Sequence, residues 1–398
     1  MFSGKEIVLG VTGGIAAYKA CEIVRELHKG SASVHVVLTA SGAQFITPLT
    51  LQTLSKNPVV TDLFNLVSES EIGHISLAQR ANLLLIAPAT ANIIGKIRNG
   101  IADDMLSTVV MATAAPVLIA PAMNSQMYAS AAVRENVATL RERGFHFVEP
   151  DEGELACGTV GPGRLADVGK ILEMGRIILS EKPLAGKRVV VSAGPTAEPM
   201  DPVRFLSNRA SGKMGFAMAR AARRLGAEVT LVSGPTALPD PHFLATVRVR
   251  TAEEMLGAVT REAEGADVVV MCAAVADFRP KKPSSRKIKK DGFGLKVELA
   301  PTPDILESLG RKKGSRLLVG FAAETDDLAQ NAREKMRRKN LDAIVANDVS
   351  RIDIGFESDN NEVRIFFPDG EVMDLPLATK DGIAVGVWLA LNGKLLRR

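Results

Sequence analysis

Three side chains in the first half of the chain have types suited to proton transfer and carboxylate binding: His74, Asn124 and Cys157. An imidazole titrates near neutral pH and can serve as a base. The Cys157 thiol, followed by Gly158 in a glycine-rich segment, can supply a proton, and the Asn124 amide can bind a carboxylate or an amide. Each residue also has a structural interpretation, because lone histidines are often solvated, single cysteines are often buried and asparagines often form turns.

A glycine pair follows the first predicted strand and precedes a helix, within residues 10–19. Backbone N–H groups at such a helix start can face an anion. The glycines have the spacing of neither a dinucleotide fingerprint nor a P-loop, so an ordinary strand-to-helix turn is an alternative. Small and polar residues also occupy 39–43, 87–92 and 100–104. Because carboxyl-end loops of an open parallel sheet gather at one crevice, we expect a ligand site there.

Four segments, 13–19, 72–77, 121–128 and 156–164, resemble the flavin-containing cysteine decarboxylases and occur in the same order. The resemblance covers nearly all of residues 1–180. It implies a flavodoxin-like fold, a trimer with FMN sites between protomers, and catalytic roles for His74, Asn124 and Cys157. One departure is Tyr128, where the family commonly has tryptophan. The FMN contacts implied by the resemblance are Gly14, Ile15, Ala16, Ser41, Pro88, Thr90 and Asn92.

The chemistry of such a decarboxylase explains these residue types. Direct loss of CO2 from a cysteinyl carboxylate leaves an unstabilised carbanion. If FMN first oxidises the CH2–SH group to a thioaldehyde, the electrons left by CO2 spread onto sulfur as an enethiolate. Reduced flavin then returns the hydride, so the cycle is redox neutral and needs no nicotinamide cofactor. His74 would be the base and Cys157 the proton donor to the enethiolate, whereas Cys21 and Cys272 are expected to be structural.

Residues 192–215 form a run rich in Gly, Pro and Ser that is too long and polar for an ordinary connection between a strand and a helix. This run resembles the signature of phosphopantothenate–cysteine ligases. The resemblance extends over most of residues 187–370 and implies CTP, Mg2+ and a ligase domain that dimerises. Later segments that match the same family are 273–280, 287–290, 302–306, 320–325, 335–339 and 346–348.

A ligase must activate the carboxylate, and attack of the carboxylate on the α-phosphate of a nucleoside triphosphate gives an acyl-nucleotide and pyrophosphate. Negative charge grows at phosphorus in this step, so fixed cations nearby should help. The resemblance gives that role to Lys287. It assigns the acyl intermediate to Asn208, the nucleotide base to Phe321, a nucleotide or metal contact to Asp277, and close backbone approach to Gly215. The other implied CTP contacts are Pro303, Asp304, Ile305, Leu306, Lys335 and Lys339.

These residues also have structural alternatives. The basic run 286–290 could be a solvated loop. Lys335 and Lys339, spaced i and i+4, could lie on an exposed helix face. Asp277, just before Arg279-Pro280, could organise a turn.

Together the two resemblances imply consecutive steps of coenzyme A biosynthesis. Cysteine is ligated to 4'-phosphopantothenate through an acyl-cytidylate, and 4'-phosphopantothenoylcysteine is then decarboxylated to 4'-phosphopantetheine. The alternative is a flavin-dependent decarboxylase of another cysteinyl substrate with a nucleotide-binding second domain. A nicotinamide dehydrogenase would lack its fingerprint glycines here and would give Cys157 no role. A nucleic-acid-binding protein is disfavoured because the net charge is +4 among 49 basic and 45 acidic residues.

The elements that must position these residues follow a clear pattern. Short apolar, β-branched runs alternate with segments of helical period, which predicts parallel α/β layers. A chain of 398 residues is longer than one core usually grows, so we expect two domains. The polar connector at 180–186 predicts a flavodoxin-like decarboxylase domain over 1–183 and a Rossmann-like ligase domain over 187–398. The strands expected are 7–12, 34–39, 83–87, 116–120, 145–148, 187–191, 229–232, 247–249, 268–272, 317–319, 343–345 and 363–367.

The composition indicates a soluble globular protein, with 46% hydrophobic and 24% charged residues. Its apolar runs are far shorter than the ~20 residues that cross a bilayer. The N-terminus lacks the features of a signal peptide, so we expect a cytoplasmic protein with no membrane segment. Three cysteines without metal-ligand spacing argue against a disulfide framework and a zinc site.

Overall fold

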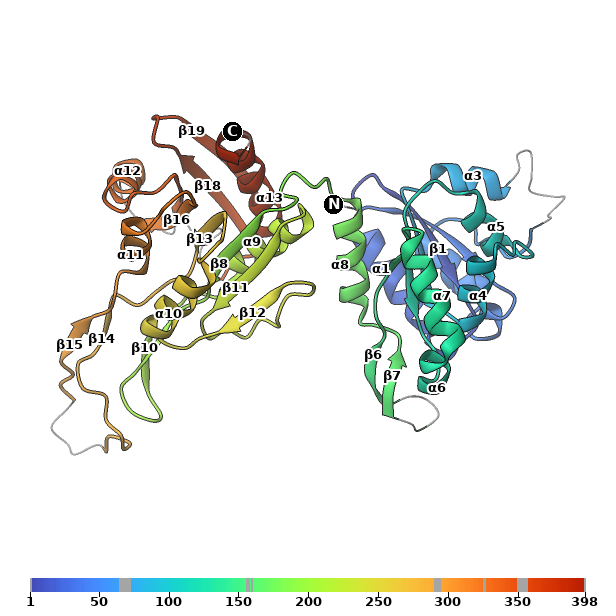
Figure 1. Ribbon diagram of the computed structural model, residues 1–398, viewed down its shortest axis with the longest axis horizontal. Coiled ribbons are helices and arrows are strands. Elements are labelled where there is room, and N and C mark those ends of the chain that lie inside the picture. The colour runs from blue at the N-terminus through green and yellow to red at the C-terminus, as the bar shows by residue number, and fades with distance from the viewer. Residues whose placement is uncertain are drawn as a thin grey trace. The chain divides into compact units, whose positions relative to one another are not determined.

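The computed structural model describes residues 2–63, 73–154, 158, 160–289, 295–324, 327–348 and 357–396 (Figure 1). The chain forms two compact units, Met1–Ser180 and Glu181–Arg398. Leu184, within the connector expected from the sequence, is fully buried in the core of the second unit. The second unit therefore begins earlier than residue 187.

The first unit contains a five-stranded parallel sheet in the order β2-β1-β3-β4-β5. This is the flavodoxin-like order, in which the direction of chain progression reverses between β1 and β3. The predicted parallel α/β fold is thus confirmed for this unit. The strands are β1 (Glu6–Val11), β2 (Ser33–Leu38), β3 (Leu83–Ala89), β4 (Val117–Pro121) and β5 (His146–Phe147).

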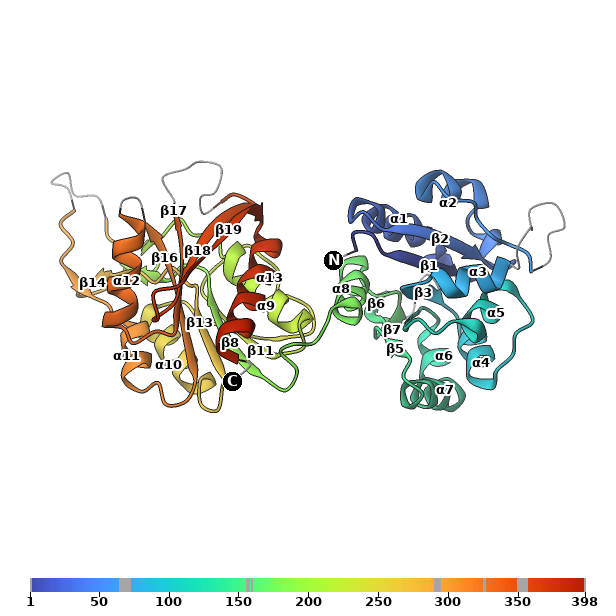
Figure 2. The same cartoon turned by 90° about the horizontal axis from the view of Figure 1, so that it is seen from above.

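Helices lie on both sides of this sheet (Figures 1 and 2). Apolar residues of α3, α4, α5 and α7 pack on one face, around Val8 and Leu84. On the other side, α1 contacts both β2 and α8, and α8 contacts β3. The helices are η1 (Ile15–Lys19), α1 (Ala20–Lys29), η2 (Gly42–Gln44), α2 (Pro48–Ser55), α3 (Gly73–Arg80), α4 (Ala91–Asn99), α5 (Met105–Ala112), α6 (Ser125–Ala129), α7 (Ala131–Glu142) and α8 (Val168–Leu179).

A small antiparallel hairpin, β6 (Asp151–Glu154) and β7 (Val160–Arg164), completes the first unit. The segment that joins its strands contains Cys157, which lies outside the described residues.

The second unit contains an eight-stranded mixed sheet in the order β12-β11-β8-β13-β16-β17-β18-β19. The strands from β12 to β17 are parallel, and β18 and β19 are antiparallel. Here the chain order reverses between β8 and β13. The strands are β8 (Arg188–Ala193), β11 (Glu228–Ser233), β12 (Ala245–Arg248), β13 (Val268–Met271), β16 (Leu317–Glu324), β17 (Ala343–Asp348), β18 (Asn360–Phe366) and β19 (Val372–Thr379).

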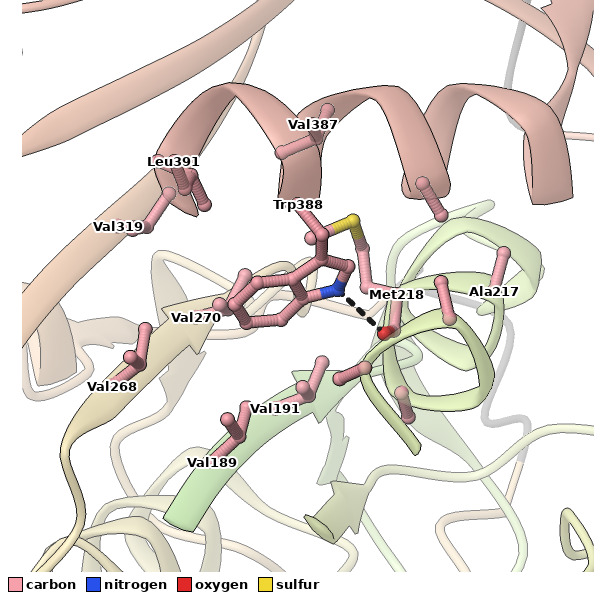
Figure 3. Packing of buried hydrophobic residues seen from close by; sticks show 14 of the residues in the cluster. Val189, Val191, Ala217, Met218, Val268, Val270, Val319, Val387, Trp388 and Leu391 are labelled. Carbon is pink, nitrogen blue, oxygen red and sulfur yellow. Dashed lines mark hydrogen bonds between the residues drawn. The ribbon is translucent and has the colours of Figure 1, made fainter. Parts of the chain in front are cut away.

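The core of the second unit includes Trp388, whose side chain is fully buried between α13, α9 and the sheet (Figure 3). Its indole Nε1 donates a hydrogen bond to the Met218 carbonyl oxygen at 2.9 Å, so the buried N–H is satisfied. Apolar residues of α10, α11 and α12 pack on the other face. The helices are α9 (Lys213–Arg224), α10 (Ala252–Glu262), α11 (Ile305–Arg311), α12 (Leu328–Arg338), α13 (Lys380–Leu391) and η3 (Asn392–Leu396).

Two small antiparallel pairs extend from this unit: β9 (Ala197–Pro199) with β10 (Phe205–Ser207), and β14 (Phe278–Pro280) with β15 (Leu299–Pro301). We call the chain from Phe278 to Pro301 the ribbon. Among the helices described, none combines the length and apolar character that crossing a lipid bilayer requires.

Two candidate active sites

In the first unit, hydrogen bonds join the loops that follow β1 and β3. The Thr12 Oγ1 donates to the Pro88 carbonyl oxygen at 2.7 Å and accepts from the Thr90 N–H at 3.1 Å. Thr12 is only 2% exposed, and its bond to the Pro88 carbonyl oxygen is buried. They place the two loops together at the point where the strand order reverses, which is where flavodoxin-like sheets bind ligands.

The loop after β2 closes against the same place. A Cβ atom on Gly13 would lie 2.4 Å from the Ser41 Cβ, so only glycine allows this approach. Gly14 has open space around its Cα, and Ile15 beside it is 62% exposed. The residues predicted to contact FMN lie together around the carboxyl ends of three strands: Gly14, Ile15 and Ala16 after β1, Ser41 after β2, and Pro88, Thr90 and Asn92 at or after β3.

Asn124 lies three positions after the end of β4 and caps α6, where its Oδ1 accepts a hydrogen bond from the Gln126 N–H at 2.8 Å. The β6–β7 hairpin packs against this segment. The Met123 N–H donates to the Gly163 carbonyl oxygen at 2.9 Å, and a Cβ on Gly163 would stand 2.2 Å from the Met123 oxygen. The hairpin that leads to Cys157 is therefore attached to the Asn124 segment.

His74 lies in the first turn of α3 and is partly buried. Residues 64–72 before it, and Cys157, lie outside the described residues. The catalytic grouping of His74, Asn124 and Cys157 thus stays a prediction. Tyr128, the departure noted above, donates its hydroxyl to Glu149 Oε2 at 2.5 Å, and Arg141 pairs with the same carboxylate.

The second unit has a pocket of about 420 Å³ at the carboxyl ends of β8 and β13, where its strand order reverses. Gly215, predicted to allow a close backbone approach, lines this pocket. The structure also brings together most of the residues that the sequence assigned to the nucleotide, since the lining includes Asp277, Pro303, Asp304, Ile305, Leu306, Phe321, Lys335 and Lys339.

Charged groups in this pocket are held in place by the backbone. The Asp304 carboxylate caps α11 by accepting from the Glu307 N–H at 2.9 Å, and it pairs with Lys339 at 2.8 Å. Burial tends to raise the pKa of Asp304, but Lys339 and the Glu307 N–H lower it below its usual range. Lys335 donates to the Phe321 carbonyl oxygen at 3.1 Å. Lys335 of α12 and Lys339, which caps the C-terminus of that helix, thus both line the pocket.

Sequence reasoning missed a second cationic group in the pocket, Lys213 and Lys380. Lys213 starts α9 and donates to Asp359 Oδ1 at 2.6 Å, while Lys380 starts α13 and donates to the Ser358 carbonyl oxygen at 2.5 Å. Burial lowers the pKa of Lys380, and the neighbouring charge of Lys213 lowers it further. Lys213 lies within the run of residues 192–215, but no local pattern marks Lys380.

Two predicted catalytic residues lie outside the pocket lining. Asn208 still touches its wall, because its Nδ2 donates to the carbonyl oxygen of the pocket residue Ala274 at 2.9 Å. Lys287 is exposed in the ribbon between β14 and β15. The described residues hold no group of three or more His, Cys, Asp or Glu that could bind a metal ion. The roles of Lys287 at a phosphate and of Asp277 at Mg2+ stay predictions.

Comparison with known families divides the chain in the same way as its fold. The model of the family described as Flavoprotein matches residues 1–177. The model described as DNA/pantothenate metabolism flavoprotein C-terminal domain matches residues 184–393. Each match falls within one compact unit.

Curated relatives match along nearly the whole chain. A protein of Bacillus subtilis is 49% identical over 384 residues, which are 96% of this chain and 95% of the relative. One of Vibrio cholerae is 47% identical over 396 residues, 99% of each chain. Both are named coenzyme A biosynthesis bifunctional protein CoaBC. A crystal structure of the C-terminal domain of a protein of that name is 44% identical, covers 55% of this chain and all of that domain, and has a TM-score of 0.47.

Proposed function

On the premise that the chain belongs to the family of bifunctional coenzyme A biosynthesis proteins, we propose that each of its two units carries one of two successive activities. The enzyme ligates cysteine to 4'-phosphopantothenate and decarboxylates the product. In our proposal residues 181–398 perform the ligation and residues 1–180 the decarboxylation. The observation that carries this division is that each unit has its own candidate site where its own strand order reverses.

In the first unit, the residues around the β1 and β3 ends fit FMN. The close contact of Gly13 with Ser41 and the open space at Gly14 leave backbone N–H groups near the start of η1 for a phosphate. The Thr90 Oγ1 accepts from the Ile93 N–H, so its own proton points elsewhere and can be donated to a ligand. Bound FMN would supply reversible hydride transfer.

The protein groups would then manage the protons and the carboxylate. Because the Asn124 Oδ1 accepts from the Gln126 N–H, its Nδ2 is the donor end of the amide and suits a carboxylate. His74 would take a proton from the substrate at the start of the cycle. Cys157 would return a proton at its end.

In the second unit, the pocket fits CTP because four lysines and a helix N-terminus surround it. Lys335 comes from α12 and Lys339 caps its C-terminus, while Lys213 and Lys380 begin α9 and α13. Cations and backbone N–H groups that are fixed before the reaction stabilise the charge that develops on phosphate. Phe321 would contact the base, and Asp277 would contact Mg2+ or the nucleotide.

The proposal includes subunit contacts for both units. Ile15 and Tyr18, beside the proposed flavin crevice, are 62% and 60% exposed, which supports a trimer that covers this edge. Phe278 and Leu299 of the ribbon are 55% and 48% exposed, which supports a dimer of the second unit.

Expression of the two units as separate fragments tests the division. The chain should be divided between Ser180 and Glu181, because Leu184 is buried in the core of the second unit and Lys182 Nζ donates to the Arg224 carbonyl oxygen at 2.8 Å. Residues 1–180 should release CO2 from supplied 4'-phosphopantothenoylcysteine without CTP. Residues 181–398 should produce CMP and pyrophosphate from CTP, 4'-phosphopantothenate and cysteine without flavin. An activity that requires both folded fragments would contradict the division.

A further inference from the structure

Asp201 is a buried carboxylate in the turn between β9 and β10. Its side chain has no exposed surface. Its Oδ1 accepts from the backbone N–H groups of Val203 and Arg204, both at 2.8 Å, which is the ordinary local pattern of an aspartate turn. Its Oδ2 accepts from the Ile288 N–H at 3.1 Å, across 87 positions of the chain. The second contact is not needed to make the turn.

Arg204 strengthens the link to the ribbon. Its Nη2 donates to the Ile288 carbonyl oxygen at 3.1 Å, and its Nη1 lies 3.7 Å from the Asp201 carboxylate. Both backbone polar groups of Ile288 are thus held by one aspartate–arginine pair. A further bond joins the Ser284 N–H to the Met200 carbonyl oxygen at 2.9 Å.

Lys287 lies between these two anchors. Ser284, three positions before it, also forms a local turn in which its Oγ donates to the Arg286 carbonyl oxygen at 2.6 Å and accepts from the Arg286 N–H at 3.2 Å. Ile288, directly after it, is held by Asp201. The Lys287 side chain is exposed while its backbone is fixed on both sides. A merely solvated basic loop would not need a buried carboxylate.

The charge of Asp201 suits a group that accepts hydrogen bonds from three backbone N–H groups. Burial by itself would raise the pKa of the carboxyl group, but the N–H groups of Val203, Ile288 and Arg204 and the Arg204 charge hold that pKa below its usual range. The group is therefore an anion at neutral pH. Asparagine at this position would replace one of the two carboxylate oxygens with an NH2 group. That group is itself a donor and cannot accept from the backbone N–H groups that the oxygen binds.

The same hairpin carries Asn208. The Ser207 Oγ donates to the Thr196 carbonyl oxygen at 2.7 Å, and the Asn208 Nδ2 reaches Ala274 in the pocket wall at 2.9 Å. β9 pairs with β10 and also contacts β14. The Asp201 turn therefore connects the hairpin that carries Asn208 with the ribbon that carries Lys287.

We propose that Asp201 is a positioning residue of the ligase, which holds the Lys287 segment in fixed register with the Asn208 hairpin. The proposal rests on the function proposed above for Lys287. It gives the buried aspartate a role in the first chemical step, formation of the acyl-cytidylate, rather than in folding alone.

A double-mutant cycle in the full-length enzyme tests this role, with Asp201→Asn, Lys287→Gln and the double variant. The measured quantities are kcat and KM for CTP in acyl-cytidylate formation. We expect Lys287→Gln to lower kcat about 100-fold, as removal of one charge-stabilising donor does. Asp201→Asn should lower kcat at least about 10-fold with a smaller change in KM, and the double variant should be no slower than Lys287→Gln, because coupled residues are non-additive.

Two further variants separate positioning from folding. Ser284→Ala removes the two Oγ hydrogen bonds of the local turn beside the other anchor, while the backbone bond to Met200 can remain. We expect a lower rate from this variant, but no further loss of rate when it is combined with Lys287→Gln. Asp342→Asn is the matched control, because Asp342 accepts the Leu318 N–H at 2.8 Å and pairs with Lys313 at 2.7 Å outside the pocket lining. The fold-reductions in rate caused by Asp342→Asn and by Lys287→Gln should therefore multiply in the double variant.

The outcomes distinguish the positioning role of Asp201 from the catalytic role of Lys287. Multiplicative effects of Asp201→Asn and Lys287→Gln, or of Ser284→Ala and Lys287→Gln, would overturn the positioning role and leave the function of Lys287 intact. An unchanged rate in Lys287→Gln would remove both, since no catalytic lysine would remain to be positioned. If Asp201→Asn does not fold, the Ser284→Ala cycle decides.

Discussion

Gly215 in the first turn of α9 is the position where one added methyl group should disturb the pocket of the second unit. An ideal Cβ there would lie 2.5 Å from the Ala193 Cβ, 2.9 Å from the Ala193 Cα and 3.0 Å from the Ser192 carbonyl oxygen. These atoms belong to the buried end of β8 and cannot rotate away. Overpacking of this kind costs up to about 3 kcal/mol, and alanine regains about 1 kcal/mol of helix propensity over glycine. We therefore expect Gly215→Ala to lower the free energy of unfolding of the second unit by about 2 kcal/mol.

Gly257→Ala provides the matched control. Gly257 lies inside α10, and a Cβ at this position would have no heavy atom within 4 Å. Only the helix propensity changes, so this variant should be stabilised by about 1 kcal/mol. For a unit of this size 1 kcal/mol corresponds to about 2–4 °C, so Tm should fall by about 4–8 °C in Gly215→Ala and rise by about 2–4 °C in Gly257→Ala.

Calorimetry of the full-length protein measures both shifts, and added CTP identifies the transition of the second unit because a ligand stabilises the state that binds it. Gly215 lines the pocket, so displacement of α9 should also weaken CTP binding by titration calorimetry. CTP affinity should be unchanged in Gly257→Ala. A Gly215→Ala enzyme with wild-type Tm and CTP affinity would show that α9 can move away from β8 without loss of stability, and would contradict the predicted overpacking.

Three further substitutions or treatments test other contacts. Asp381→Asn removes the anion that pairs with two arginines of α9, one of them the buried Arg224, and should cost about 2 kcal/mol by urea unfolding at pH 7. Those arginines, against the opposing effect of burial, lower the pKa of Asp381, so the wild-type advantage should be present at neutral pH and vanish as the pH falls through that lowered pKa. Gly163→Ala, at φ +144° and against the Met123 carbonyl oxygen, should reduce CO2 release but not CMP formation. Burial raises the pKa of Cys272 to about 12, so native protein at pH 8 should resist alkylation at this thiol until urea unfolds it, as mass spectrometry would show.

The sequence allowed the parallel strands to be predicted, because each is a short apolar run followed by a helical period. It did not reveal β19, where Pro376 interrupts an alternating run. Proline cannot donate to a ladder and usually argues against a strand, but β19 is at the edge of its sheet and tolerates it. The hairpins β9–β10 and β14–β15 were also missed, since proline-rich and polar segments read as loops.

The sequence predicted those pocket residues that lie within short local motifs. Lys335 and Lys339 lie four positions apart at the end of one helix and its cap, and residues 302–306 form one segment, so a resemblance could identify them. Lys380 reaches the pocket only because α13 packs along α9 and because the chain near Ser358 joins it to Lys213. The Lys213 and Lys380 regions are more than a hundred positions apart in the sequence, so no pattern within a short segment could predict that they meet.

In the proposed function the two sites use the same architectural position for different ligands, and their side chains account for the difference. In both units the ligand would lie where the strand order reverses, and in both a glycine allows two loops or elements to approach, Gly13 at Ser41 and Gly215 at Ala193. The seven residues proposed for FMN are uncharged, which suits a flat ring system with a single phosphate held by backbone and hydroxyl groups. The second pocket adds four lysines to the same backbone arrangement, which suits a triphosphate whose charge must be neutralised. The shared edge of a parallel sheet thus supplies the position of both candidate sites, and in the proposed function the charge of the side chains placed there suits flavin in one unit and a nucleotide in the other.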